Sequence, residues 1–250
     1  MSSFVEKKRD SLTNCVTGDA NPAIHVATGE PSHPIALVCT PNAEIMMEAQ
    51  KDAQLRDILN SSALVIADGA GVVLASKILG YRSLVRVPGF DLVSKLLTNP
   101  SDYPYSFFLF GGKPGVAETA ASKLLELAPN VRIAGYRDGY FNDEQTPDII
   151  DCINSSGADI LLVALGAPKQ EKWMYDNRHN LSCAVCIGVG CSLDVFAGTA
   201  ALAPAFFRNS GLEWLYRLFK EPRRIGRMVR LPKYILYTVF WRLFKHGKQS

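Results

Sequence analysis

The sequence predicts an α/β fold built on a doubly wound, mostly parallel sheet, and three observations carry this prediction. Short apolar runs recur along the chain, the spacers between them are as long as helices, and the runs are continuously apolar rather than alternating. Strands that helices cover on both faces are continuously apolar, whereas strands with one face in water alternate. Strands that alternate with helices favour parallel pairing, because each parallel connection needs a crossover of helix length.

The predicted strands of this sheet are six apolar runs: Ile35–Cys39, Ala63–Ala67, Ser106–Phe110, Val131–Gly135, Asp159–Leu165 and Ala184–Val189. Between them, apolar residues at helical spacing predict helices over Asn42–Leu59 and Val116–Leu127. Residues 35–200 therefore form the predicted α/β domain, which is Rossmann-like.

The chain on either side of this domain has a different pattern. Residues 1–34 are polar, contain scattered Pro and Gly and show no periodicity, so they are predicted to form an irregular N-terminal arm. Residues 201–250 are predicted to form a C-terminal helical appendage, in which Pro222 and Pro232 separate three short helices: Leu212–Lys220, Ile225–Arg230 and Tyr234–Phe244.

Charge is distributed unevenly between the appendage and the rest of the chain. The appendage has eleven Lys or Arg and two acidic residues, whereas the whole chain has a net charge of only +3. A basic segment on an acidic body indicates a polyanionic partner, which is a membrane surface, phosphate groups or nucleic acid. Aromatic and aliphatic residues are interleaved with the cations, which favours an anionic lipid interface over nucleic acid. Alternatively, the appendage packs its aromatic side chains on the core and leaves its cations in water, and both interpretations can hold together.

Neither a signal sequence nor a membrane span is expected. No apolar h-region follows the basic residues near the start, and no apolar run reaches the roughly 18 residues that a spanning helix needs. The chain has six cysteines, several of them inside apolar strands. Cys183-x-x-Cys186 has the spacing of a zinc motif but lacks a second pair, so we expect buried thiols and a reducing, cytoplasmic compartment.

Polar side chains follow one predicted strand in the run LLVALGAPKQEKW. In an open parallel sheet, ligands bind beyond the carboxyl ends of the strands. Here the strand ends at Gly166, and Lys169, Gln170 and Glu171 follow at the start of a helix. A solvated surface turn would also be polar, so this run alone supports a binding site and a plain connection equally.

Two further strand ends carry polar side chains. Thr40 and Asn42 follow the first predicted strand, where Asn42 is either a helix cap or a ligand contact. Asp68 follows the second predicted strand, where it is either a helix cap or a general base in a partly desolvated cleft.

Two glycine pairs suggest phosphate or dinucleotide binding without completing a known motif. Gly111 and Gly112 precede a helix and offer backbone N–H groups to a diphosphate, but no Gly-Lys-Ser/Thr follows. Gly188-x-Gly190 is half of a dinucleotide fingerprint, which leaves a nicotinamide-dependent oxidoreductase as an alternative of another class. No Asp-x-Asp pair stands at a strand end, so we expect no divalent metal.

Taken in order, these segments resemble the WecG/TagA/CpsF family of bacterial glycosyltransferases, and its TagA-like branch in particular. The resemblance spans about residues 35–230 and rests on the following motifs: TPNAEIMMEAQKD, ADGAGVVLASKILG, RVPGFDL, FFLFGGKPGVAE, DGYF, ALGAPKQEKWM, GVGCSLDVFAGT and GLEWLYRLFKEPRR. It implies an inverting, metal-independent transfer of N-acetylmannosamine from its UDP ester to GlcNAc-diphospho-undecaprenol, in wall teichoic acid or related surface-polymer synthesis. Another member of the family that uses a different UDP-hexose for an exopolysaccharide is the alternative within this class.

The resemblance also implies roles for single residues. Asp68 is similar to the family's general base, and Thr40, Asn42 and Gln170 are similar to residues that hold sugar and acceptor. Arg86 would stabilise charge near the diphosphate. The remaining substrate-binding candidates are Gly111, Gly112, Gly166, Lys169, Glu171, Asp194 near the nucleoside, and Arg217, Arg224 and Arg227, which would reach the departing diphosphate from the appendage.

The expected partners follow from these roles. They are a UDP-sugar donor, a polyprenyl-diphosphate-linked acceptor and an anionic membrane surface that binds residues 201–250, with no nucleic acid and no cofactor. The resemblance implies a peripheral protein at the cytoplasmic face of the plasma membrane, with the appendage as a lid over the active site. A homo-oligomer is compatible with the sequence. One departure is Leu202, which stands before Ala203-Pro204 where the family usually has Arg.

Overall fold

The computed structural model describes residues 35–81, 84–98, 105–220 and 230–245, so the predicted N-terminal arm lies outside the described residues. Within these ranges the six predicted strands are confirmed, in the strand order β2-β1-β6-β5-β3-β4. Their bounds are β1 Ala36–Cys39, β2 Leu64–Val65, β3 Ser106–Gly111, β4 Arg132–Arg137, β5 Ile160–Ala164 and β6 Val185–Gly188. The pairs β1/β2, β3/β4, β3/β5 and β5/β6 are all parallel, which confirms the α/β fold class.

The chain divides into two compact units that interleave along the sequence. Unit 1 contains the described residues up to Leu37 together with Val93–Ala200. Unit 2 contains Val38–Leu92 together with the described part of Ala201–Ser250. The boundaries fall within β1 and within helix α5 (Gly89–Thr98), and each unit is described below by itself.

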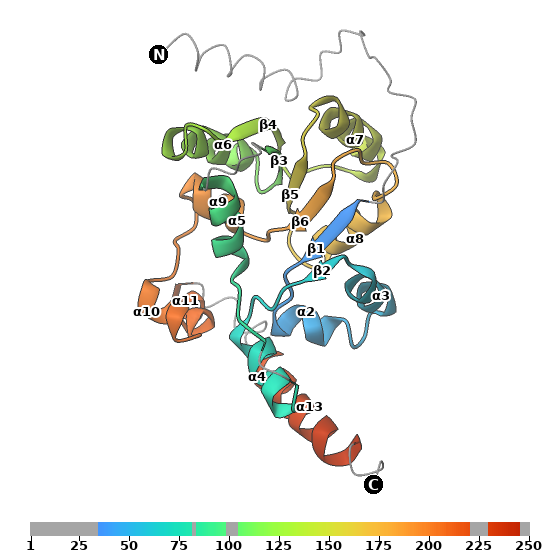
Figure 1. Cartoon of the computed structure of the whole chain (residues 1–250), viewed down its shortest axis with the longest axis vertical. Coiled ribbons are helices and arrows are strands. Elements are labelled where there is room, and N and C mark those ends of the chain that lie inside the picture. The colour runs from blue at the N-terminus through green and yellow to red at the C-terminus, as the bar shows by residue number, and fades with distance from the viewer. Residues whose placement is uncertain (1–34, 82–83, 99–104, 221–229, 246–250) are drawn as a thin grey trace. The chain divides into compact units, whose positions relative to one another are not determined.

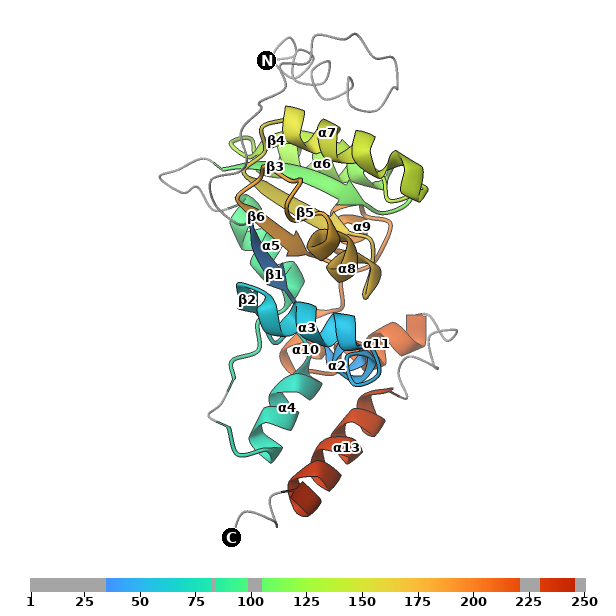
Figure 2. The same ribbon diagram turned by 90° about the vertical axis from the view of Figure 1, so that its right-hand side faces the viewer.

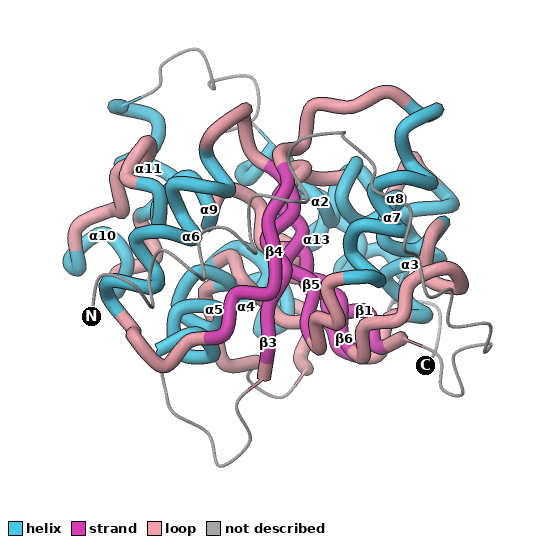
Figure 3. The backbone as a smooth tube through the Cα atoms, turned by 90° about the horizontal axis from the view of Figure 1, so that it is seen from above, coloured by secondary structure: helices cyan, strands magenta, loops and turns pink. Residues whose placement is uncertain are grey.

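Unit 1 has three layers, with the strands β4-β3-β5-β6 between two layers of helices (Figures 1 and 3). Helices α6 (Val116–Leu127) and α9 (Ser192–Ala197) cover one face, and α7 (Thr146–Ser155) and α8 (Lys169–Asp176) cover the other. The core between these layers is apolar and fully enclosed: its largest side chains include Phe108, Phe110, Leu124, Ile149, Leu161, Leu162 and Met174. Helices on both faces explain why the strands are continuously apolar.

The winding of unit 1 reverses between β3 and β5. The chain leaves β3 toward β4 on one side and later returns to place β5 on the other side of β3. The helix after β3 is α6, on one face, and the helix after β5 is α8, on the opposite face. In open α/β sheets, ligands bind outside the carboxyl ends of the strands near such a reversal of winding.

Unit 2 contains the pair β1/β2 and a set of helices: α2 (Ala43–Glu48), α3 (Ala53–Ser61), α4 (Ala70–Ile78), α10 (Ala205–Asn209), α11 (Glu213–Lys220) and α13 (Arg230–Lys245). Helix α13 runs beside α4 and also packs on α2 (Figures 1 and 2). Its Tyr234 is buried in a small apolar cluster with Ala67, Val72 and Ala75. The appendage therefore packs part of its apolar surface on the N-terminal helices.

Two helix predictions need correction. The helix predicted over Asn42–Leu59 is two helices, α2 and α3, because the Asp52 carboxylate accepts a hydrogen bond from the Leu55 N–H at 3.0 Å and begins a new helix. Pro232 does not separate helices, since it lies in the first turn of α13, where a missing N–H costs nothing. The helices predicted over Val116–Leu127 and Leu212–Lys220 are confirmed to within one residue. Of the segment Ile225–Arg230, all but Arg230 lies outside the described residues.

The cysteines in the described part of the chain are free thiols, and Cys39, Cys183 and Cys186 are buried. The Sγ atoms of Cys183 and Cys186 lie 3.7 Å apart. Burial and the neighbouring thiol raise the pKa of Cys186, which keeps its proton in the interior. None of the helices in the described ranges has the length and apolar content needed to cross a bilayer.

Candidate active site

In unit 2, three residues predicted for the site lie around the ends of β1 and β2. A Cβ added to Gly89 would lie 3.4 Å from Thr40 Oγ1, and one added to Gly69 would lie 3.2 Å from Asn42 Cβ. Asp68 immediately precedes Gly69, and its Oδ1 accepts a hydrogen bond from the Gly89 N–H at 2.7 Å. Short strands followed by tight turns therefore bring Thr40, Asn42 and Asp68 together within one unit.

Asn42 is a helix cap, which is one of the two roles expected from the sequence. Its Oδ1 accepts hydrogen bonds from Glu44 N and Ile45 N at 2.9 and 3.1 Å and thereby begins α2. Because the cap uses the oxygen, a ligand contact by Asn42 would be made through its Nδ2 donors.

Asp68 does not cap α4, which begins after Gly69 without a side-chain cap. The Asp68 side chain turns instead toward the segment 86–89, whose backbone runs beside it: Val87 N donates to the Ala67 carbonyl at 3.1 Å. The Gly89 N–H fixes one carboxylate oxygen, so the orientation of this half-buried carboxylate is set by the fold. A fixed, partly desolvated carboxylate at a strand end is suited to general base chemistry.

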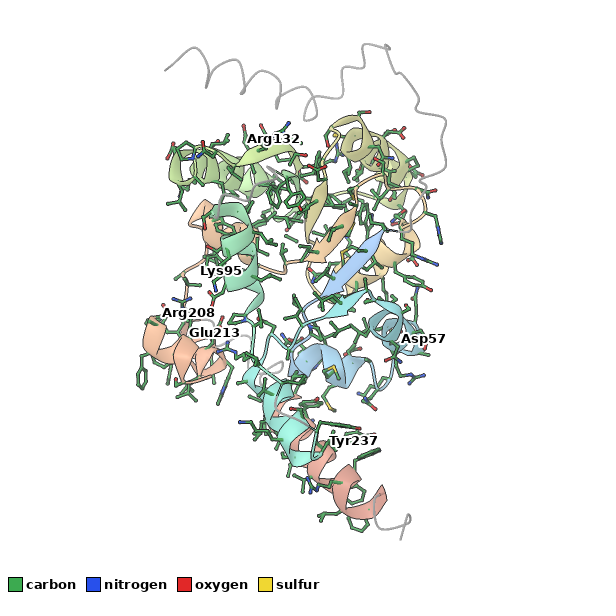
Figure 4. The ribbon with its side chains drawn as sticks, in the orientation of Figure 1. Asp57, Lys95, Arg132, Arg208, Glu213 and Tyr237 are labelled. Carbon is green, nitrogen blue, oxygen red and sulfur yellow. The ribbon has the colours of Figure 1, made fainter. Side chains whose placement is uncertain are left out.

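Arg86 joins the Asp68 loop to the appendage. Its Nε donates to the Asp68 carbonyl at 2.9 Å, one terminal nitrogen donates to the Arg208 carbonyl, and the other pairs with Glu213 Oε2 at 3.0 Å. The side chains of Arg86 and Glu213 are each only 19% exposed. Figure 4 labels Arg208 on α10 and Glu213 at the start of α11. In this arrangement the Arg86 guanidinium is held by protein groups on three sides.

In unit 1, glycines at strand ends let three loops approach one another closely. Gly112 N donates to the Ala164 carbonyl at 3.0 Å, and Gly139 N donates to the Gly112 carbonyl at 2.9 Å. Gly111 has φ +126°, and a Cβ on it would lie 2.4 Å from the Ala164 backbone. The Gly112 N–H is thus bonded within the fold, and the clearest role of the glycine pair is to bring the loops after β3 and β4 close to each other and to the end of β5.

The polar cluster after β5 is divided between the interior and the surface. Gln170 and Glu171 are 2% and 1% exposed, whereas Lys169 is exposed. Gln170 Oε1 accepts from the Gly190 N–H at 3.1 Å, and Gln170 Nε2 donates to Glu171 Oε1 at 2.9 Å. Glu171 Oε2 is buried and has no hydrogen-bond partner among the described residues. Desolvation raises the pKa of Glu171 above its ordinary value, so burial favours its neutral form.

An open pocket of about 560 Å³ lies beside Lys169 in unit 1. Its lining comes from the loop after β4 and from the start of α8: Gly139, Tyr140, Phe141, Asn142, Gln145 and Lys169. The ammonium group of Lys169 lies 4.4 Å from the centre of the Phe141 ring, and Tyr140 is 65% exposed. An aromatic surface next to a cation is suited to a ligand that combines a flat ring with negative charge.

The other predicted residues are placed as follows. Gly166, with φ +75°, ends β5, and its carbonyl accepts the Gln170 N–H at 2.9 Å. Asp194 lies in α9, where its Oδ1 accepts a hydrogen bond from Thr199 at 3.5 Å. Arg217 belongs to α11, but its side chain, together with Arg224 and Arg227, lies outside the described residues.

Sequence reasoning missed residues that line the pocket in unit 1 and one residue, Glu213, in unit 2. The pocket residues Tyr140, Phe141 and Asn142 follow the strand β4, so the rule that ligands bind beyond strand ends would have found them. Glu213 carries no local signal, because its partner Arg86 is 127 residues away.

Comparison with known proteins agrees with a glycosyl transferase built on this fold. The family described as "Glycosyl transferase WecG/TagA/CpsF family" matches residues 14–249, and the chain belongs to this family. A Bacillus subtilis (strain 168) protein named N-acetylglucosaminyldiphosphoundecaprenol N-acetyl-beta-D-mannosaminyltransferase is 39% identical over 201 residues, which are 80% of this chain and 78% of the relative. A protein of the same name from Bacillus spizizenii (strain ATCC 23059 / NRRL B-14472 / W23) is 37% identical over 215 residues, or 86% of this chain and 81% of the relative. These findings do not favour a different hexose or an oxidoreductase.

Proposed function

We propose that this chain transfers N-acetylmannosamine from UDP-N-acetylmannosamine to GlcNAc-diphospho-undecaprenol, in wall teichoic acid or related surface-polymer synthesis. The names of two relatives at 37–39% identity support this donor sugar and this acceptor. The observation that carries the proposal is the gathering of Thr40, Asn42 and Asp68 in unit 2, where Gly89 N–H orients the Asp68 carboxylate.

The reaction we propose is a single displacement with inversion. Asp68 takes the proton of an acceptor hydroxyl while that oxygen forms a bond to the anomeric carbon of the sugar. The bond from this carbon to the UDP oxygen breaks, and UDP leaves with the electron pair. Thr40 and Asn42 would position the reacting hydroxyl and the sugar, which lowers the entropic part of the barrier.

The departing UDP needs positive and dipolar groups around its diphosphate. We assign this role to the appendage arginines Arg217, Arg224 and Arg227 and, independently of them, propose that Lys169 of unit 1 binds the substrate. The pocket that Tyr140 and Phe141 line beside Lys169 would hold the flat uracil ring. No metal and no cofactor takes part in this proposal.

We also propose that the protein binds the cytoplasmic face of the plasma membrane through α13. One side of this helix packs on α4 and α2, and the other exposes large apolar side chains: Leu236, Tyr237, Val239, Phe240, Leu243 and Phe244. Lys233 and Arg242 are exposed on the same helix. A helix of 16 residues is about 24 Å long, too short to cross a bilayer, but its apolar side and cations suit the lipid interface.

The test of the catalytic proposal is Asp68→Asn. Asparagine keeps the size of the side chain and an oxygen that can accept the Gly89 N–H, but it cannot take a proton. We expect turnover with UDP-N-acetylmannosamine and a short-chain GlcNAc-diphospholipid to fall about 10²- to 10⁴-fold while UDP binding persists. The matched control is Asp57→Asn, the same change at an exposed position of α3, which should leave turnover unchanged. Full activity of Asp68→Asn would refute the role of Asp68. If the wild-type protein transferred another hexose instead of N-acetylmannosamine, the proposed donor would be refuted.

A further inference from the structure

The contacts of Arg86 form a continuous chain from the appendage to the proposed general base. Glu213, at the start of α11, pairs with one terminal nitrogen of Arg86 at 3.0 Å. The Nε of the same guanidinium donates to the Asp68 carbonyl at 2.9 Å. A guanidinium is planar and rigid, so fixing one of its nitrogen atoms restricts the positions of the others. The position of Glu213 is therefore transmitted to the backbone of Asp68.

The same segment holds Asp68 a second time. Gly89, three residues after Arg86, donates its N–H to the Asp68 carboxylate at 2.7 Å. Residues 86–89 thus contact Asp68 at its main-chain oxygen and at its side-chain oxygen. A shift of this segment would move the carboxylate that must meet the acceptor hydroxyl.

A second ion pair of opposite polarity aligns the appendage with this segment. Arg208 of α10 pairs with Asp91 of α5 at 3.0 Å, so the appendage supplies the cation here and the anion to Arg86. The turn between α10 and α11 also lies against the start of α4, because a Cβ on Gly211 would lie 2.8 Å from Ala70 Cβ. Because the two ion pairs have opposite polarity, they fix one alignment of α10 and α11 against residues 86–91. A shift of the appendage along this segment would bring like charges together.

The two ion pairs differ in their surroundings and in what they touch. Arg86 and Glu213 are each 19% exposed, whereas Arg208 and Asp91 are 27% and 39% exposed. Removing the partner of a mostly buried charge leaves that charge unpaired, and the structure then rearranges to reach water. The Arg86 side chain of the first pair also donates a hydrogen bond to the Asp68 carbonyl.

We propose that Glu213 is a positioning residue: it orients Arg86, which holds the Asp68 loop, so that docking of α10 and α11 sets the geometry of the proposed base. This inference rests on the proposed function. It assigns the appendage a task besides covering the site and binding the departing diphosphate.

The experiment compares Glu213→Ala, Glu213→Gln and Asp91→Asn in the full chain. We expect Glu213→Ala to lower kcat about 10- to 100-fold, the range that a small misplacement of a reacting group produces, with KM for UDP-N-acetylmannosamine changed less than about twofold. Glu213→Gln should lie between Glu213→Ala and wild type, because its amide oxygen still accepts from Arg86. Asp91→Asn weakens docking but leaves the Arg86–Glu213 pair and the Gly89 hydrogen bond to Asp68 in place, so its kcat should stay within about threefold of wild type.

Docking is measured separately by the rate at which trypsin cleaves within residues 201–250. A loss of kcat in Glu213→Ala that exceeds the loss in Asp91→Asn, at equal cleavage rates, supports the positioning role. The inference is overturned if kcat of Glu213→Ala stays within about threefold of wild type, or if both variants lose kcat in step with faster cleavage. A wild-type protein that transfers no sugar from UDP-N-acetylmannosamine would overturn the proposed function instead, before any variant is compared.

Discussion

Replacing Gly111 with alanine should destabilise unit 1 far more than the same change at Gly157. Both glycines have φ between +20° and +160°, at +126° and +62° respectively. Alanine in such a conformation destabilises the folded state by about 1–2 kcal/mol. Alanine also lowers the conformational entropy of the unfolded chain, which offsets about 0.4–1 kcal/mol of this loss. Around Gly157 nothing lies within 4 Å of the added Cβ, so we expect a net loss of about 1 kcal/mol for Gly157→Ala.

Gly111→Ala adds a steric conflict to this conformational cost. The new Cβ would lie 2.4 Å from the backbone carbon and oxygen of Ala164, whereas carbon atoms in contact prefer about 3.5–4.0 Å. Backbone cannot move aside as a flexible side chain can, and overpacking of this kind costs about 1–3 kcal/mol. The total expected loss for Gly111→Ala is therefore about 2–4 kcal/mol.

The assay is unfolding of the two variants and the wild type in urea, monitored by far-ultraviolet circular dichroism. The free energy of unfolding should fall with urea concentration at the same slope in all three proteins, which checks that the same transition is compared. Both positions lie in unit 1, so they report on the same part of the chain. If the free energies of unfolding of Gly111→Ala and Gly157→Ala differ by less than about 0.5 kcal/mol, the close approach of the ends of β3 and β5 does not exist as described.

Two further predictions concern a buried carboxyl and the outer side of α13. Because the pKa of Glu171 is raised, the folded state keeps a proton at pH values where the unfolded state has already released it. The stability that this group contributes is therefore fully present below the ordinary glutamate pKa and is lost as pH rises through the pKa of the folded state. Unfolding measured at several pH values between about 4 and about 8 should show this decline in wild type but not in Glu171→Gln, and parallel curves would contradict the assignment. The double change Phe240→Ser and Leu243→Ser should weaken binding to vesicles with anionic lipid about tenfold or more, whereas Leu127→Ser, an equally exposed leucine on α6, should have no effect. Equal vesicle binding by both variants in a sedimentation assay would exclude α13 as the contact.

Much of the sheet and part of the site were predictable because their signals are local. A run such as Asp159–Leu165 is apolar at every position that both layers of helices cover, and Gly166 marks the turn that follows it. Asp68 and Thr40 were predicted as site residues for the same reason, since Thr40 directly follows β1 and Asp68 directly follows the predicted strand Ala63–Ala67. The break between α2 and α3 was missed although Asp52 offered a cap, because apolar spacing alone does not register a helix end.

The sequence by itself determined which segments are strands and, to within about two residues, which polar side chains follow them. Only the tertiary structure decided that Glu171 is buried beside Gln170, that the described part of residues 201–250 belongs to the same unit as residues 38–92, and that Arg86 pairs with Glu213. The physical reason is range. Strand formation and chain turns depend on neighbours a few residues apart, whereas burial and ion pairing depend on contacts between residues that lie far apart in the chain and meet only once the helices have packed.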